Sequence, residues 1–539
     1  MENKNTVIAM VLMLVVWVGF SILYPSQRPL APTADSPAVA QNTTAETSPP
    51  AMPSAPTPEQ GGVDLLGSDI VVGGSEEEVV VEHPFFRAVF TNIGARLKSL
   101  ELKQYTATSD PGDGGVSLVH ADSARFATLA SSGGGDFDLS ADTYFSVDGG
   151  KDGLRLDAGE EGELVFLTRL PSGLIVAKSF FFNGDQYEIR AEIKVHNQGA
   201  GKQRGAIDFS LVEPEIDPDS AGAYDFVGAS TMTGGKVEKV SAEDIGEEVN
   251  VYKQDPVWTG FGNKYFLSAI VPLQGAVKSI RLEKDGPITR NIVEAPEQIL
   301  APGEAAYYQY VLYFGPRDLD ILKQVGHQLS EAVDFGFFSP IAKPLLHVLK
   351  FFYGFLGNYG LSIILLTVII KLLFWPLTQK SYSSMKAMQK LQPQMQKIRE
   401  KFGKDRERLN KEIMELYKTH RVNPLGGCLP MLVQIPVFFA LYKTLMEAIE
   451  LRHAPFYLWI TDLSAKDPYY VTPLIMGATM FLQQKMTPST LDPMQAKLFL
   501  MMPIIFTFMF LNFPSGLVLY WLVNNLLTIG QQYYINKKA

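Results

Sequence analysis

The sequence contains one cysteine, Cys428, so no intramolecular disulfide can form and no multi-cysteine zinc or iron–sulfur site exists within the chain. Seven histidines are present, but none has the H-E-x-x-H spacing of a zinc protease. The glycine-rich patterns that bind nucleotides and the G-x-S-x-G pattern of hydrolases are also missing. We therefore expect no cofactor, no metal ion and no catalytic residue, and a protein that is not an enzyme.

Charge divides the chain into two parts. Residues 25–336 carry 24 Lys and Arg against 46 Asp and Glu, a net charge of −22, whereas the remainder carries 23 against 11, a net charge of +12. The mean hydropathy of +0.06 and the hydrophobic content of 46% are high for a soluble protein. An acidic, water-soluble part and a basic, apolar part face different surroundings, which excludes a single soluble globule.

The N-terminal segment contains an uncharged apolar run of 18 residues, 7–24, which spans about 27 Å as a helix and can cross a bilayer. The rival reading is a cleaved signal peptide, but the Ala38-Val39-Ala40 site lies 14 residues beyond the run. We therefore expect residues 1–24 to be an uncleaved transmembrane anchor with a cytoplasmic N-terminus. Residues 25–62 are rich in Pro, Ala, Ser and Thr and are predicted to be a disordered periplasmic linker.

Residues 63–335 show short alternating segments separated by clusters of Gly, Asn and Asp. The clearest alternation covers residues 188–195, and a helical pattern appears only late, at residues 319–333. This spacing predicts an antiparallel β-sandwich.

Residues 336–357 form a predicted amphipathic helix. Lys343, His347 and Lys350 are spaced i, i+4 and i+7 and share one helical face, while Ser339 and Pro340 suit the N-cap and the first helical position. Such a helix fits the bilayer interface, where its polar face stays hydrated and its aromatic face enters the acyl region. The alternative is a core helix of the preceding domain.

Five further apolar runs make six candidate spans with the first. We expect these five runs to be transmembrane helices within a helical region that covers residues 358–539. They lie at residues 359–377, 427–446, 469–486, 498–513 and 516–535. Residues 378–425 carry 12 Lys and Arg against five Asp and Glu, whereas residues 447–468 carry two against four. The positive-inside rule therefore places 378–425, the short loop 487–497 and the C-terminus in the cytoplasm, and the acidic domain outside.

Polar residues occur inside several of these runs. Lys371 lies about four residues from the cytoplasmic end of its run, Gln434 lies in the third, and Asn524, Asn525 and Thr528 lie in the sixth. Each is costly in lipid, which favours a wet cavity inside the bundle. The alternatives are that Lys371 extends to the inner interface and that the others are hydrogen bonds between helices. No Asp or Glu accompanies Lys371, which disfavours a proton relay.

The basic segment 378–425 has apolar residues every three or four positions on both sides of Gly403, which predicts an antiparallel helical hairpin. Its charge of +7 suits anionic lipid or ribosomal RNA, although many of its lysines would serve equally well as ordinary coiled-coil surface.

Four short motifs occur in order along the apolar part of the chain. They are Pro376-Leu377-Thr378, Leu391-Gln392-Pro393, Asn423-Pro424-Leu425-Gly426-Gly427-Cys428 and Phe513-Pro514-Ser515-Gly516-Leu517-Val518-Leu519-Tyr520. With the N-terminal anchor and the large outside domain, they make the sequence resemble the YidC family of bacterial membrane protein insertases, whose relatives act in mitochondria and chloroplasts. The resemblance covers essentially the whole chain.

The resemblance implies an α-helical polytopic membrane protein with six transmembrane helices, a five-helix conserved core and an all-β periplasmic domain. It implies a hydrophilic groove open to cytoplasm and lipid, in which the family typically carries an arginine where this sequence has Lys371. That departure keeps the charge but loses the two-pronged geometry of a guanidinium. Tyr520 and Trp521 correspond to a client-contacting face. The predicted groove residues are Lys371, Thr367, Gln434, Tyr520, Trp521, Asn524 and Thr528.

The implied function is insertion and folding of nascent proteins in the bacterial inner membrane, alone or with the Sec translocon and its accessory subunits, without nucleotide hydrolysis. The implied partners also include the ribosome, through the basic hairpin and the C-terminus, and anionic lipids, but not DNA. Two other classes remain, a solute transporter or channel and an envelope enzyme with a sugar-active outer domain. A transporter should show repeated halves and paired intramembrane carboxylates, which the sequence lacks.

Overall fold

The structure is a computed structural model. It describes residues 73–110, 112–121, 126–148, 152–214, 226–246, 249–273, 275–403, 405–420, 422, 425–487 and 493–538. The predicted anchor, residues 1–24, and the predicted linker, residues 25–62, lie outside the described residues.

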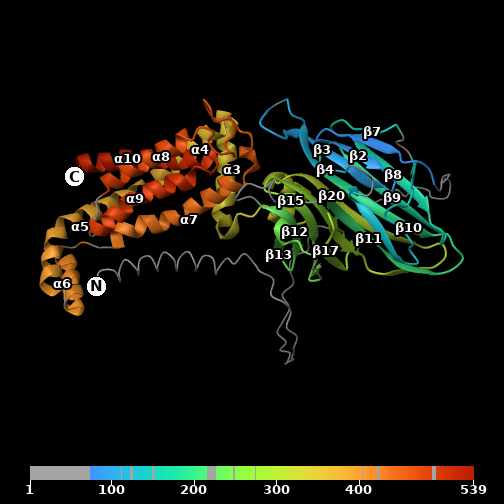
Figure 1. The fold of residues 1–539 in the computed structure, drawn as a ribbon, viewed down its shortest axis with the longest axis horizontal. Coiled ribbons are helices and arrows are strands. Elements are labelled where there is room, and N and C mark those ends of the chain that lie inside the picture. The colour runs from blue at the N-terminus through green and yellow to red at the C-terminus, as the bar shows by residue number, and fades with distance from the viewer. Residues whose placement is uncertain are drawn as a thin grey trace, which may run out of the picture. The chain divides into compact units, whose positions relative to one another are not determined.

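The described part of residues 78–338, here called the β domain, contains three sheets, and Figure 1 labels many of their strands. The five-stranded sheet has the order β4 (Gly115–His120), β3 (Arg96–Thr106), β2 (Phe86–Thr91), β1 (Glu78–Glu82), β7 (Leu154–Arg155). The nine-stranded sheet has the order β13 (Lys236–Ser241), β12 (Val227–Thr233), β15 (Trp258–Asn263), β16 (Phe266–Pro272), β20 (Ala305–Pro316), β10 (Glu188–Asn197), β9 (Leu174–Asn183), β8 (Glu161–Arg169), β6 (Ser146–Asp148). The six-stranded sheet has the order β14 (Asn250–Tyr252), β17 (Ser279–Asp285), β18 (Ile288–Glu294), β11 (Gln203–Pro214), β19 (Gln298–Leu300), with β5 (Ala130–Gly135) also paired to β11.

The alternation that predicted strands is realised in β10. Its residues 189, 191, 193 and 195 are buried while the intervening positions are more exposed, because successive side chains of a strand point to opposite faces. Its pairings with β9 and β20 are antiparallel, as predicted, whereas β1 and β7 form a parallel pair.

The nine-stranded sheet packs against both smaller sheets. Phe180 on β9 meets Phe90 on β2 with ring centroids 4.8 Å apart, and Tyr310 on β20 meets Phe209 on β11 at 4.7 Å. Burying each large apolar side chain contributes roughly 1.5–3 kcal/mol, so these facing layers stabilise the domain. The prediction of a β-rich domain is confirmed.

The helical pattern at residues 319–333 forms two short pieces, α2 (Leu319–Val325) and the 3₁₀ turn η4 (Leu329–Ala332). Asp318 caps α2, since its carboxylate accepts hydrogen bonds from the backbone N–H groups of Asp320 and Ile321. A second turn, η5 (Gly336–Phe338), leads directly into α3 (Ser339–Leu356). The prediction that Ser339 caps this helix is wrong, because η5 already orders the chain and Phe338 holds the cap position.

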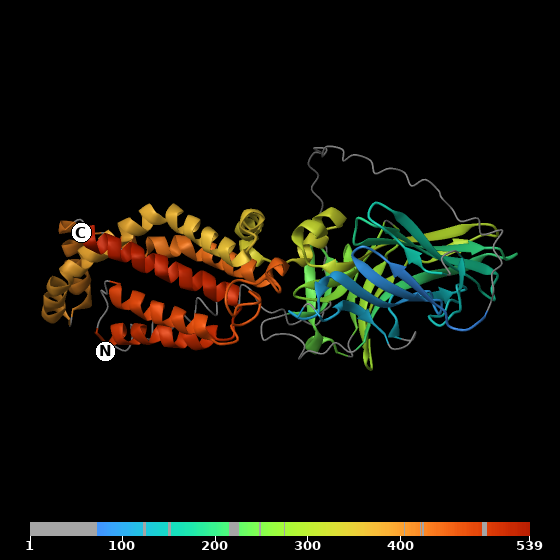
Figure 2. The same ribbon diagram turned by 90° about the horizontal axis from the view of Figure 1, so that it is seen from above.

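The chain after α3 is also helical, and Figure 2 shows its helices in a turned view. They are α4 (Tyr359–Leu373), α5 (Trp375–Phe402), α6 (Arg406–Thr419), α7 (Leu425–Glu447), η6 (Ile449–Leu451), α8 (Val471–Met486), α9 (Pro493–Phe510) and α10 (Ser515–Lys538). Helices α5 and α6 are the two arms of the predicted basic hairpin. Helix α10 contacts α8, α4 and α7.

By length and apolar composition, none of the helices in the described residues is by itself sufficient to cross a bilayer. The pair α4 and α5 meets the criterion together, with a bend of 59° between them. The bend lies just before Pro376, in the first turn of α5, since proline has no N–H to donate to the preceding turn.

Candidate functional site

Lys371 is the centre of a polar cluster between α4 and α10. The residue is 8% exposed, and its Nζ donates hydrogen bonds to Thr528 Oγ1 at 2.6 Å and to Asn524 Oδ1 at 3.3 Å. Both partners are neutral oxygen atoms on α10. The side chain is therefore buried and held by a neighbouring helix.

The spacing of α10 explains why these partners face Lys371. Tyr520, Asn524 and Thr528 follow one another at intervals of four, so they lie on one face of the helix. Thr528 donates its own hydroxyl hydrogen to Asn524 O at 2.6 Å, which leaves its oxygen oriented to accept from the ammonium. One helix thus presents two acceptors to the same cation.

Thr367 lies one turn before Lys371 on α4 and is 2% exposed. Its hydroxyl donates to Ile363 O at 2.6 Å, within its own helix. Gln434, on α7, is half-buried, and within the described part of the chain no hydrogen bond joins it to Lys371. The structure therefore places Thr367 beside the cluster and does not bring Gln434 into it.

Tyr520 and Trp521 belong to an aromatic cluster. The Trp521 ring lies 5.0 Å from Phe438 on α7 and 4.8 Å from Phe510 on α9, both in edge-to-face orientation. The Tyr520 ring lies 6.2 Å from the same Phe438. Edge-to-face pairs fix ring orientation. The predicted site is thus two adjacent clusters on α10, one polar and one aromatic.

Sequence reasoning missed a continuation of the polar row. Gln532 is 1% exposed, and its Nε2 donates to Tyr382 Oη on α5 and to Thr487 Oγ1 at 3.0 Å. Gln531 is equally buried and donates to Trp375 O at 3.4 Å. The signal was present, because residue 532 extends the four-residue interval of 520, 524 and 528.

The polar face of α3 is bound by carboxylates. Lys343 pairs with Glu331 at 3.4 Å, and Lys350 pairs with Asp320 at 2.6 Å. Other residues of the helix are exposed large hydrophobics: Val348, Phe351, Tyr353, Phe355 and Leu356. The expected amphipathic division is present, with ion pairs in place of a simply hydrated face.

Comparisons with known proteins agree along the whole chain. A family model described as 60Kd inner membrane protein matches residues 351–539, and one described as YidC periplasmic domain matches residues 78–348. A protein from Citrifermentans bemidjiense named membrane protein insertase YidC is 46% identical, with 99% of each chain covered. A protein of the same name from Geobacter sp. strain M21 is 48% identical, with 86% of each chain covered.

Among solved structures, one described as an active YidC insertase with its first transmembrane domain resolved covers 86% of this chain and 94% of its own. The sequence identity is 18% and the TM-score is 0.35. The score is too low to add to the sequence relationship.

Proposed function

Because the chain belongs to the YidC family of membrane protein insertases, we propose that it inserts nascent membrane proteins into a bacterial inner membrane through the polar cluster around Lys371. The observation that carries the proposal is a buried cation whose described partners, Asn524 and Thr528, are both neutral. An ammonium group has three hydrogens to donate, and these partners take two. A carbonyl or carboxylate of a client takes the third.

The mechanism follows from the cost of moving polar groups through lipid. A charged or polar segment held at Lys371 avoids part of the few kcal/mol that crossing the inner half of the bilayer costs. The adjacent apolar segment then moves past α7 and α9 into lipid, where burial contributes about 25 cal/mol per Å². The aromatic cluster of Tyr520 and Trp521 guides this step, and no nucleotide is consumed.

The proposal includes a topology of six spans with both termini in the cytoplasm and residues 63–335 in the periplasm. Residues 336–357 lie at the periplasmic interface of the inner membrane. Helix α3 exposes Phe351 and Phe355 on one side and pairs its basic residues with carboxylates on the other. The basic segment 378–425 contacts the ribosome and anionic lipid, and clients also arrive from the Sec translocon.

The test is insertion of a short two-span client into liposomes that contain only the purified protein, scored by protease protection. We expect Lys371→Ala to slow insertion by about tenfold or more, since a hydrogen bond to a charged group contributes about 1.5–3 kcal/mol. Lys371→Arg should retain most of the activity, because it keeps the charge.

The matched control is Lys443→Ala, which removes a lysine of α7 that is 41% exposed and pairs with Glu447 four residues away. Insertion by Lys443→Ala should equal that of the wild type. Equal rates for wild type, Lys371→Ala and Lys371→Arg at equal expression would refute the role of Lys371. No insertion by the wild type would refute autonomous insertase activity.

A further inference from the structure

Lys350 joins α3 to two other parts of the chain through three carboxylates. Its Nζ lies 2.6 Å from Asp320 Oδ2 and 3.3 Å from Asp318 Oδ2, both at the start of α2 in the β domain. It also lies 3.1 Å from Glu450 Oε1 in η6. The Lys350 side chain is 27% exposed and that of Glu450 only 8%. Burial alone would lower the pKa of Lys350, but the carboxylates, Glu450 first, outweigh burial and raise it.

Arg452, two residues after Glu450, forms a second link between this segment and the β domain. Arg452 Nη2 donates to the backbone oxygens of Thr106 at 2.9 Å and Ala107 at 3.0 Å, where β3 ends. Its guanidinium also lies over the ring of Phe266, 5.2 Å from the centroid. The Arg452 side chain is therefore held against the β domain by two charge-assisted hydrogen bonds and a ring contact.

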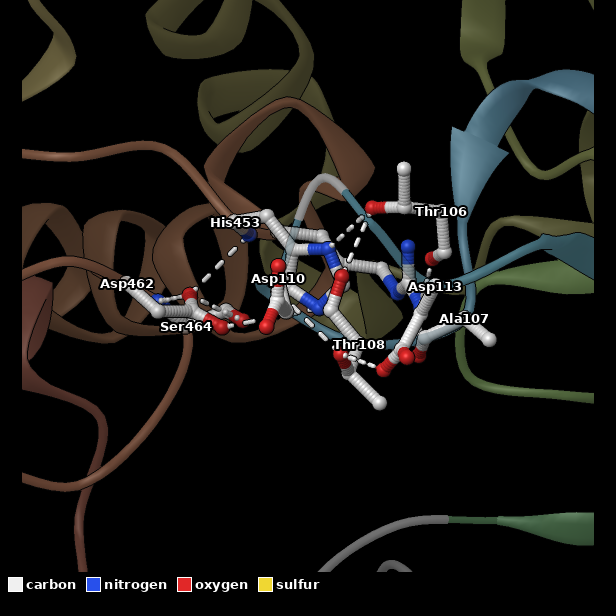
Figure 3. A network of polar contacts seen from close by, with 9 residues as sticks. Thr106, Ala107, Thr108, Asp110, Asp113, His453, Asp462 and Ser464 are labelled. Atoms are coloured by element: carbon white, nitrogen blue, oxygen red, sulfur yellow. Dashed lines mark hydrogen bonds and ion pairs between the residues drawn. The ribbon is translucent and has the colours of Figure 1, made fainter.

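Figure 3 shows the neighbouring contact, in which His453 points toward Thr106 and Asp462. Thr106 Oγ1 donates to Thr108 O at 2.7 Å, so the 3.2 Å contact with His453 Nδ1 requires that the ring nitrogen donates. The His453 backbone N–H donates to Asp462 Oδ1 at 3.1 Å. The histidine is therefore fixed between the β domain and its own loop.

Glu450, Arg452 and His453 belong to one segment, residues 448–470, here called the joining loop. The joining loop also holds the beginnings of two helices. Asn358 caps α4 and donates to Phe456 O at 3.3 Å, while the Ser515 N–H at the start of α10 donates to Ala465 O at 2.7 Å. Helices α4 and α10 are the two that carry Lys371, Asn524 and Thr528.

The approach of the joining loop to α4 is close. A Cβ placed on Gly360 would meet Phe456 Cδ2 at 2.1 Å, so only glycine fits there without a shift. On α10, the Gly516 N–H donates to Leu463 O at 2.8 Å. Displacing the joining loop therefore displaces the first turn of both helices, because packed interiors do not deform continuously.

We propose that Lys350 and Arg452 are positioning residues for insertion: they hold the joining loop against the β domain, and the joining loop fixes the spacing of α4 and α10. This inference rests on the proposed insertase function and adds to it a route by which the β domain acts on the polar cluster. Neither residue touches the client.

The experiment uses the full chain with Cys428→Ala, labelled with spin probes at Leu365→Cys on α4 and Leu526→Cys on α10, positions that are 37% and 50% exposed. We expect Lys350→Met and Arg452→Met to broaden the distance distribution between the probes. Insertion of the two-span client should slow by roughly two- to thirtyfold, the range for coupling through a packed network. Lys350→Arg should restore both measurements.

The matched control is Lys343→Met, which removes a lysine of the same helix whose partner Glu331 is 51% exposed. It should leave the distance distribution and the rate unchanged. Unchanged distances in Lys350→Met and Arg452→Met would overturn the inference, whether or not insertion slows. Failure of the wild type to insert would instead overturn the proposed function, and the distances would still decide the coupling.

Discussion

Asp467, in the joining loop, binds the start of α8. It is 1% exposed, and its carboxylate accepts hydrogen bonds from Tyr469 N at 2.9 Å, from Thr472 N at 2.7 Å and from Thr472 Oγ1. These donors belong to the first turn of α8 and the residues just before it, where N–H groups have no partner within the helix. The carboxylate thus replaces a conventional N-cap side chain.

We expect Asp467→Ala to destabilise the start of α8 by about 2–4 kcal/mol, since a bond to a charged acceptor contributes about 1.5–3 kcal/mol and three donors lose their partner. Thr472→Val should cost about 1 kcal/mol, because it removes one hydroxyl and keeps the shape. In the double variant Asp467→Ala/Thr472→Val the two destabilisations should not add, since both changes remove the same hydrogen bond between Thr472 Oγ1 and the Asp467 carboxylate.

The assay is hydrogen exchange of the peptide that contains Tyr470 to Met476 in the full chain, together with thermal unfolding in detergent. Burial raises the pKa of Asp467, but the hydrogen bonds from Thr472 and Tyr469 outweigh it and lower the pKa. Its stabilisation is therefore present above the unfolded pKa and lost as pH falls through the folded pKa. Wild-type exchange protection in Asp467→Ala would refute this reasoning.

Two further predictions concern other buried positions. His83 is 1% exposed; Nε2 donates to Asn183 O at 2.9 Å and Nδ1 accepts from Phe85 N at 3.2 Å, an arrangement that requires the neutral ring. Burial lowers the pKa of His83, so the β domain should lose up to about 1.4 kcal/mol per pH unit as pH falls below 6.5. Denaturant unfolding at pH 7.5 and 5.5 should show a steeper loss in wild type than in His83→Leu, and equal losses would contradict the assignment. Gly360→Ala should cost about 1–3 kcal/mol by overpacking against Phe456, and Phe456→Leu should recover part of it in thermal unfolding. A melting temperature of Gly360→Ala equal to the wild type would mean that the loop moves freely there.

Local pattern was sufficient for much of the fold. The alternation at residues 188–195 predicts β10, and the charge spacing of Lys343, His347 and Lys350 predicts one face of α3. The Ser339 cap was wrong because the preceding turn η5, which a periodicity argument does not see, already supplies the start of the helix.

The sequence indicated which residues belong to the site but not which of them contact one another. Lys371 stood out because a charge in an apolar run is costly, but its partner Thr528 is 157 residues away and follows from packing alone. Gln434 has the same polar character, yet within the described residues no hydrogen bond joins it to Lys371. The carboxylates around Lys350 come from two distant segments, so no local pattern could reveal them.

The bend of 59° between α4 and α5 has a mechanical consequence. Helix α5 runs for 28 residues, about 42 Å at about 1.5 Å per residue, with Pro393 inside it. Phe374, three residues beyond Lys371, lies at the bend and is taken here as the pivot. A rotation of about 10° at the pivot moves the far end by about 7 Å on this length. A small rotation at this bend, which adjoins the polar cluster, therefore corresponds to a much larger displacement at the far end of α5 in the basic hairpin.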